Sequence, residues 1–357
     1  MLKKGDVRLG YADSKTGKLQ IQTYYEKQRL AGAYLTLLNE LRRAKTEYRL
    51  NDWLFYQLTT RAVEKTGAGK TKQHRVFMRW LLLNLAGFDC RLTYEGNRVY
   101  LNLFTYDNLY EIPMIQDGGK TFVNVSENEY PSSRAESLYI TDYVPNPGGR
   151  AFDFSMHELP LLPARPTRKR LEFQANFETY ELEFFYDKTL TDIMRDYPYL
   201  ADDEYFAVPM SPALRESLLP ALRELLADKT QQEALSILAG LTRSGFGYKL
   251  DEQQFGKSRP MIAEELFLYP YSDCEDRCAL FYNLAKELVG TPMIVLAFDD
   301  HVSIAVSSEM EGDRIIWEGK NYYVADPTGP TNSSHIGYFP RGYRERDFEV
   351  IAEFLGK

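Results

Sequence analysis

The chain has 357 residues, enough for two or three domains of about 150 residues each. Apolar residues make up 44% and charged residues 26%, which is ordinary for a folded protein and excludes a largely disordered chain. The formal net charge is −8, with 43 Lys and Arg against 51 Asp and Glu, so the composition argues against a nucleic-acid partner, which needs a basic surface. The longest apolar stretch falls short of the roughly 20 residues that span a bilayer, so no membrane partner is expected.

The cysteine count and the N-terminus bear on the compartment. Three cysteines, Cys90, Cys274 and Cys278, are too few for a disulfide framework. The opening Met-Leu-Lys-Lys is not followed by the apolar run of a signal peptide. The sequence as given predicts a cytoplasmic protein, and an exported (periplasmic or surface) protein whose leader had been removed would read the same way.

Residues 1–89 have the spacing of helices. Apolar residues recur every three or four positions in residues 30–41, again after Asp52, and from about Lys72 to Gly87. Asp52 is a good helix N-cap, and Gly87 is a common helix stop. We therefore expect an N-terminal helical module over residues 1–89.

Residues 90–205 change to a period of two. Residues 90–94 and 98–103 predict a hairpin, and alternation returns in residues 171–177 and 180–186. Ser, Pro and Gly clusters between residues 126 and 169 predict loops. We expect a β-rich region over residues 90–205. By its position, this region and the helical module would select a substrate or bind a partner protein.

The last part, residues 206–357, opens with helices and then a cysteine at a helix start. Ser211 before Pro212 is a typical helix start, and residues 230–233 match a capping box. A further apolar stripe ends at Gly290 and predicts a helix starting near Ser272 or Asp273, with Cys274 in its first turn. The free N–H groups and dipole of a helix N-terminus favour thiolate, whereas Cys278, one turn on, is expected in the core.

Two polar residues at strand ends complete a possible catalytic set. Residues 293–298, 301–306 and 321–325 have strand patterns, which puts His301 at the start of the second strand and Asp326 after the third. In the order Cys274, His301, Asp326, the chain would supply a nucleophile, a base and an acid that orients the base. Cys274 and Cys278 with His301 make a poor zinc site because no second close pair of ligands exists, so neither a metal nor a cofactor is expected.

The segment Asp273-Cys-Glu-Asp276, the histidine 27 residues after Cys274 and the segment Tyr323-Val-Ala-Asp-Pro-Thr328 resemble the transglutaminase-like superfamily of papain-related cysteine enzymes, in its bacterial protease-like branch. The resemblance covers residues 211–340. It implies an α+β, papain-like C-terminal domain in which a helix bearing Cys274 packs on an antiparallel sheet bearing His301 and Asp326. Many members have glycine before the Asp-Cys pair, where this chain has Ser272.

The resemblance also implies an activity on peptide or carboxamide bonds through a thioester. Members often supply an oxyanion-stabilising side chain upstream of the cysteine, and Gln254 fits that place better than Gln253. Hydrolysis by a protease or amidase acting on a protein or peptide is favoured, since no calcium-loop pattern is present. The alternatives are a protein-glutamine acyltransferase and a non-catalytic binding module of the same fold.

Overall fold

The computed structural model describes residues 14–65, 71–95, 98–126, 138–329 and 335–356. Two compact units divide the chain, Met1–Ser155 and Met156–Lys357. Both combine helices with a five-stranded antiparallel sheet, so the protein is α+β, as predicted. Over these ranges, none of the helices has the length and apolar character that crossing a membrane would take.

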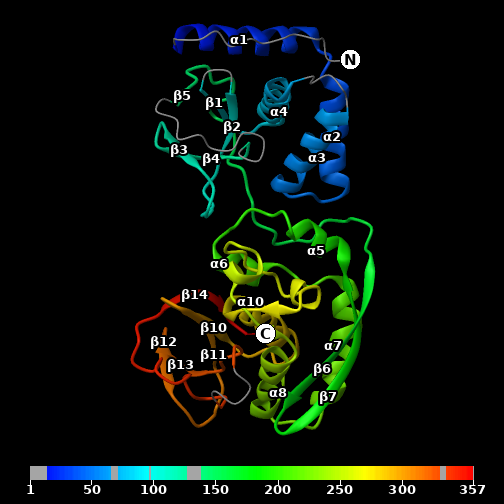
Figure 1. Ribbon diagram of the computed structural model, residues 1–357, viewed down its shortest axis with the longest axis vertical. Helices are drawn as coiled ribbons and strands as arrows, with labels where there is room; N and C mark the ends of the chain where they lie inside the picture. Colours follow the sequence, from blue (N-terminus) through cyan, green and yellow to red (C-terminus); the bar gives the residue numbers. More distant parts are fainter. Residues whose placement is uncertain (1–13, 66–70, 96–97, 127–137, 330–334, 357) are drawn as a thin grey trace. The chain divides into compact units, whose positions relative to one another are not determined.

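The first unit holds four helices and a five-stranded sheet in its described part (Figure 1). The strands follow the order β3–β4–β2–β1–β5. The element bounds are α1 (Ser14–Ala31), α2 (Leu35–Glu47), α3 (Asp52–Lys65), α4 (Lys72–Ala86), β1 (Cys90–Glu95), β2 (Arg98–Phe104), β3 (Met114–Asp117), β4 (Lys120–Asn124) and β5 (Tyr139–Ile140).

Helix α4 joins the helices of this unit to its sheet. Its apolar residues are buried, and the Trp80 indole N–H donates to the carbonyl of Cys90 on β1 at 3.3 Å. The helix ends at Gly87, whose φ of 105° lies in the left-handed region that favours glycine. The predicted N-cap of α3 is wrong by one residue: Asn51 accepts the N–H of Leu54, while the Asp52 carboxylate binds Arg150 and Lys45.

The second unit contains the remaining elements. Its large sheet has the order β12–β13–β11–β10–β14, and β6–β7 and β8–β9 are two-stranded. The bounds are β6 (Pro166–Ala175), β7 (Glu178–Asp187), α5 (Lys188–Met194), α6 (Asp202–Ala207), α7 (Pro212–Leu226), α8 (Gln231–Ser244), β8 (Gly247–Tyr248), α9 (Asp251–Gln254), the 3₁₀ turn η1 (Glu265–Phe267), β9 (Tyr271–Ser272), α10 (Cys274–Leu288), β10 (Met293–Phe298), β11 (His301–Val306), β12 (Arg314–Trp317), β13 (Lys320–Val324) and β14 (Glu349–Phe354).

These two units differ from the expected division into residues 1–89, 90–205 and 206–357. The helical module and the first hairpin form one unit because α4 packs against β1 and β2. The long hairpin β6–β7 belongs to the second unit because α7 packs on β7 and α8 on β6. The approach of α8 is close: a Cβ on Gly240 would lie 2.5 Å from the Cβ of Ala175.

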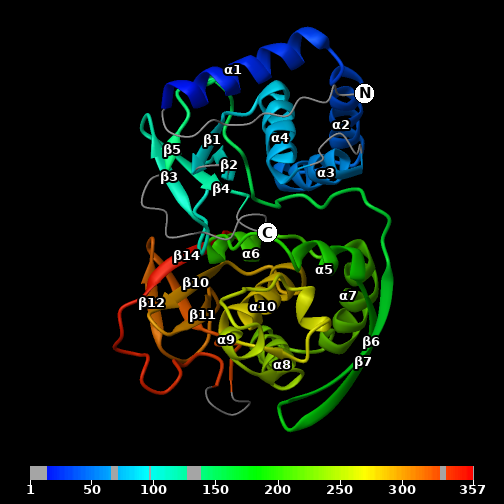
Figure 2. The same ribbon diagram turned by 45° about the horizontal axis from the view of Figure 1, so that its top comes forward.

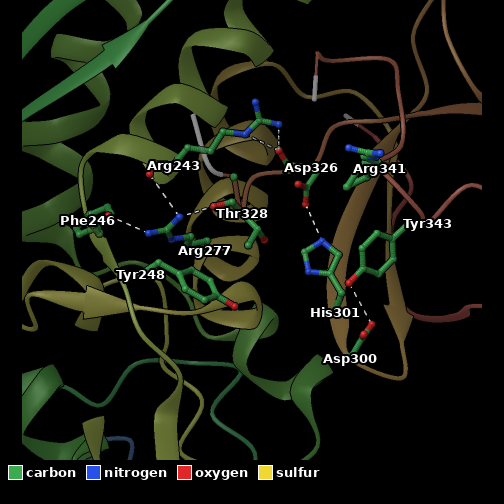
Figure 3. A pocket seen from close by; sticks show the side chains of 12 residues that line it. Arg243, Phe246, Tyr248, Arg277, Asp300, His301, Asp326, Thr328, Arg341 and Tyr343 are labelled. Atoms are coloured by element: carbon green, nitrogen blue, oxygen red, sulfur yellow. Dashed lines mark hydrogen bonds and ion pairs between the residues drawn. The ribbon is translucent and has the colours of Figure 1, made fainter. Parts of the chain in front are cut away.

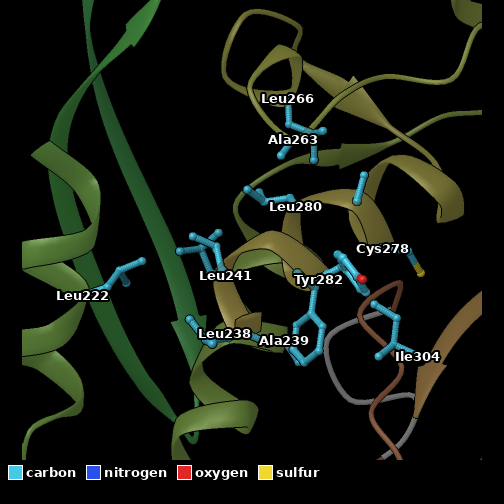
Figure 4. Packing of buried hydrophobic residues seen from close by; sticks show 14 of the residues in the cluster. Leu222, Leu238, Ala239, Leu241, Ala263, Leu266, Cys278, Leu280, Tyr282 and Ile304 are labelled. Atoms are coloured by element: carbon cyan, nitrogen blue, oxygen red, sulfur yellow. The ribbon is translucent and has the colours of Figure 1, made fainter. Parts of the chain in front are cut away.

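Helix α10 lies in the middle of the second unit (Figures 1 and 2). One side contacts β11 of the large sheet, and other sides contact α6, α7 and α8. Its inward residues are buried among apolar side chains of these elements, some of which Figure 4 shows. The first turn of α10 is therefore held against the strand that begins with His301.

Candidate active site

The start of α10 is fixed by acidic side chains around its first turn. Asp273 is the N-cap, and its backbone N–H donates to the carboxylate of Asp276 at 3.2 Å. The same carboxylate accepts the N–H of Met261 at 2.7 Å. These bonds make Cys274 the first helical residue, as the sequence predicts.

The two cysteines of α10 both lie against β11. Cys278 is fully buried, and its thiol donates to the carbonyl of Val302 at 3.3 Å, in keeping with its expected core position. The backbone of Val302 also lowers the pKa of the Cys274 thiol, one turn earlier in the helix. The candidate nucleophile thus lies beside the residue that follows His301 in the chain.

His301 and Asp326 are brought together by the pairing of β11 with β13. His301 Nε2 lies 3.0 Å from Asp326 Oδ1, and the hydroxyl of Ser303 donates to the same oxygen at 3.2 Å. Both side chains are buried, with 10% of the His301 side chain and 1% of the Asp326 side chain exposed. Among the residues that the structure describes, Nδ1 of His301 has no hydrogen-bond partner. That nitrogen is available to take a proton.

The loop that carries Asp326 is held through three successive backbone carbonyls, those of residues 326–328; Figure 3 shows the contacts made by Arg243 and Arg277. Two of the donors belong to the last turns of α8 and the third to α10. Arg243 Nε donates to the carbonyl of Asp326 at 3.0 Å, and Thr242 Oγ1 donates to that of Pro327 at 2.9 Å. Arg277 Nη1 donates to the carbonyl of Thr328. The Asp326 carboxylate is therefore fixed from both sides, by its loop and by His301.

Several features of this arrangement favour the protonated form of the Cys274 thiol. Burial raises its pKa well above the ordinary value, and the neighbouring carboxylates of Glu275 and Asp273 raise it further. The thiol donates to Glu275 Oε2 at 3.1 Å. Within the part of the chain that the structure describes, Cys274 and His301 form no hydrogen bond with each other. The helix N-terminus, which by itself favours thiolate, is thus opposed here by burial and by nearby negative charge.

Three carboxylates cluster beside Cys274. Oxygen atoms of Asp251, Asp273 and Glu275 all lie within 4.8 Å of one another. Burial and mutual repulsion raise the pKa of Asp251 to about 7 and that of Glu275 to about 8. These oxygens are the kind of ligands that a hard divalent cation takes, a possibility that the sequence reasoning did not consider.

A cavity of about 650 Å³ opens over His301 and Asp326 (Figure 3). Aromatic and cationic side chains dominate its wall, and neither Cys274 nor Gln254 is among the lining residues. The lining residues are Arg243, Phe246, Tyr248, Arg277, Asp300, His301, Asp326, Thr328, Gly329, Pro340, Arg341 and Tyr343.

Gln254, the predicted oxyanion residue, is the last residue of the short helix α9. Both polar atoms of its amide are buried without a hydrogen-bond partner among the described residues. Sequence reasoning missed Arg277, Glu275 and Arg341. Glu275 and Arg277 lie in the charged run that follows Asp273, and nothing in that run says which groups they contact; no sequence signal marked Arg341.

Comparison with protein-family models, with curated proteins and with solved structures finds nothing that matches this chain.

Proposed function

We propose that the second unit is a cysteine-dependent hydrolase, a protease or amidase of the transglutaminase-like type. The observation that carries the proposal is the pair of His301 and Asp326 at 3.0 Å, with Cys274 at the start of helix α10, which packs on the strand that begins with His301. A histidine with one ring nitrogen on a buried carboxylate and the other free is the arrangement that a thiol nucleophile needs.

In the first half-reaction, the thiol turns from Glu275 toward His301, and Nδ1 takes its proton. The sulfur forms a bond to the carbonyl carbon of a peptide or carboxamide, and the carbonyl electron pair moves onto oxygen. Collapse of this tetrahedral species breaks the C–N bond, and the leaving amine takes the proton from the imidazolium. Asp326 keeps the ring oriented and stabilises its positive charge throughout.

In the second half-reaction, His301 takes a proton from water, and the hydroxide attacks the thioester. The C–S bond breaks, the acid leaves, and the sulfur recovers the proton. The oxyanion of both steps needs donors, and the Gln254 amide is our candidate because its buried N–H has no partner among the described residues. No cofactor enters either step.

The test is peptide release from a proteome-derived peptide mixture, followed by mass spectrometry. We expect new termini with the wild type and none above background with Cys274→Ser or His301→Ala. Cys278→Ser keeps a donor for the Val302 carbonyl and His157→Ala changes an exposed histidine, so both controls should remain active.

Adding a primary amine to the same reaction separates the two outcomes of a thioester. Products that gain only water support assignment as a hydrolase. Incorporation of the amine at glutamine would instead support assignment as an acyltransferase. Products that persist in Cys274→Ser would rule out both.

A further inference from the structure

A tight turn carries one arginine to the mouth of the cavity. The N–H of Tyr343 donates to the carbonyl of Pro340 at 3.1 Å, and Gly342 has a φ of 90°. Residues 340–343 therefore form a type II turn, with Arg341 at its second position and glycine where a positive φ is required.

This turn is attached to the catalytic pair. The Tyr343 ring lies on the His301 ring, with centroids 4.9 Å apart, and its hydroxyl donates to Asp300 at 3.1 Å. Arg346 binds the same Asp300 carboxylate at 2.6 Å. The backbone position of Arg341 is thus fixed relative to His301, although its side chain is exposed.

Arg341 differs from the other charged groups of the cavity wall. Arg243 and Arg277 donate hydrogen bonds from their guanidinium groups to backbone carbonyls. The two carboxylates are engaged as well, Asp326 with His301 and Asp300 with Arg346. Within the described ranges, Arg341 makes no hydrogen bond or ion pair, so its guanidinium keeps all its donors for a ligand.

The polarity of the wall favours an anionic ligand group. Three arginines and two carboxylates line the cavity. The charge of one of these carboxylates, Asp300, is balanced by Arg346, which does not line the cavity. Figure 3 shows Arg341 and Tyr343 on one side of the cavity and Tyr248 on the other, so a bound chain would pass between an arginine and aromatic rings. A guanidinium binds a carboxylate through two parallel hydrogen bonds.

We propose that Arg341 is a specificity residue that binds a carboxylate of the substrate near the bond attacked by Cys274. The substrate is then a peptide with an acidic side chain or a C-terminal carboxylate at that position. This inference rests on the proposed function, because it takes Cys274 as the nucleophile and His301, which lines the cavity, as the base.

The test uses three matched affinity labels and needs no known substrate. The labels are chloroacetyl-Gly-Glu-amide, chloroacetyl-Gly-Gln-amide and chloroacetyl-Gly-Gln with a free C-terminus. In each, the Cys274 sulfur displaces chloride from carbon, and His301 takes the thiol proton. Labelling of Cys274 in the full chain is followed by mass spectrometry for the wild type, Arg341→Gln, Arg341→Lys and Arg344→Gln. Arg344 is a matched control because it is an exposed arginine of the same loop that pairs with Asp313 outside the cavity wall.

We expect one of the carboxylate labels to react about tenfold faster than the neutral amide. The faster label identifies the source of the carboxylate, a side chain or a C-terminus. Arg341→Gln should bring the ratio near one, Arg341→Lys should keep part of it, and Arg344→Gln should leave it unchanged. The ratio should also fall with added salt, because Arg341 is exposed to solvent.

Two other results would overturn the inference, and they differ in what they mean for the proposed function. Rapid labelling of Cys274 with no preference for a carboxylate, or a preference that survives Arg341→Gln, refutes the role of Arg341 and leaves the proposed function in place. If no probe labels Cys274 faster than it labels free glutathione, the proposed function is refuted, and the inference about Arg341 is refuted with it.

Discussion

Arg277 offers the sharpest test of how the site is held together. Its guanidinium is 2% exposed and donates to the carbonyls of Phe246 and Thr328 and to the hydroxyl of Ser272. Replacement by methionine keeps a side chain of similar length and removes all of these bonds. We expect Arg277→Met to destabilise the second unit and to release the loop that follows Asp326.

The size of the effect follows from the acceptors left behind. Each buried carbonyl left unpaired costs about 1–3 kcal/mol, so those of Phe246 and Thr328 together cost about 2–6 kcal/mol. Part of this is offset because the variant no longer buries a charged guanidinium. A net loss of about 3 kcal/mol is expected, which at a urea slope of about 2–3 kcal/mol per molar lowers the midpoint by about 1 M.

Thiol labelling in increasing urea measures the loss in each unit separately. Cys278 is buried in the second unit and Cys90 in the first, so their labelling midpoints report the two units. The Cys278 midpoint should fall in Arg277→Met, and Arg223→Met, an exposed change on α7, should leave it in place. A loss below about 1 kcal/mol would refute the view that Arg277 holds the site together.

Three further predictions concern the catalytic set. Cys274→Ser should abolish turnover yet change thermal stability by only about 1 kcal/mol, whereas Leu284→Ala, at a fully buried position of the same helix, should cost about 2–5 kcal/mol in a denaturation experiment. Asp326→Asn should leave measurable turnover while His301→Ala leaves none, because the carboxylate orients the base without touching the substrate; equal loss in both would contradict this order. Glu275→Gln should move the pH profile of Cys274 alkylation to lower pH, since the Glu275 charge raises the thiol pKa. The folded protein holds the Glu275 proton up to a pKa of about 8, whereas the unfolded chain loses it near 4.5, so wild-type stability falls as pH rises through that window. The free energy of unfolding of Glu275→Gln, relative to wild type, should therefore rise from pH 5 to pH 8, by at most roughly 5 kcal/mol. Urea titrations at both pH values, with a chelator present, measure this difference, and an equal difference at the two pH values would contradict the prediction.

The local signals in the sequence located the three long helices of the second unit and several of its strands. The Thr230–Glu233 capping box, the start of α10 at Cys274 and the strand Met293–Phe298 all lie where the pattern puts them. These features are set within one helical turn or one strand, so neighbouring residues determine them. The order of Cys274, His301 and Asp326 on a helix start and two strands was readable for the same reason.

Tertiary structure decided which segments share a unit and how deeply the Cys274 thiol is buried. The division at Ser155 depends on α4 covering one sheet and α7 and α8 covering the hairpin β6–β7, and no local period encodes such pairings. The raised pKa of the Cys274 thiol likewise depends first on burial, which the sequence neighbours Glu275 and Asp273 reinforce. Arg277 reaches carbonyls 31 and 51 residues away in the chain. Such contacts form only when the chain is folded, because side-chain chemistry alone does not specify the partner.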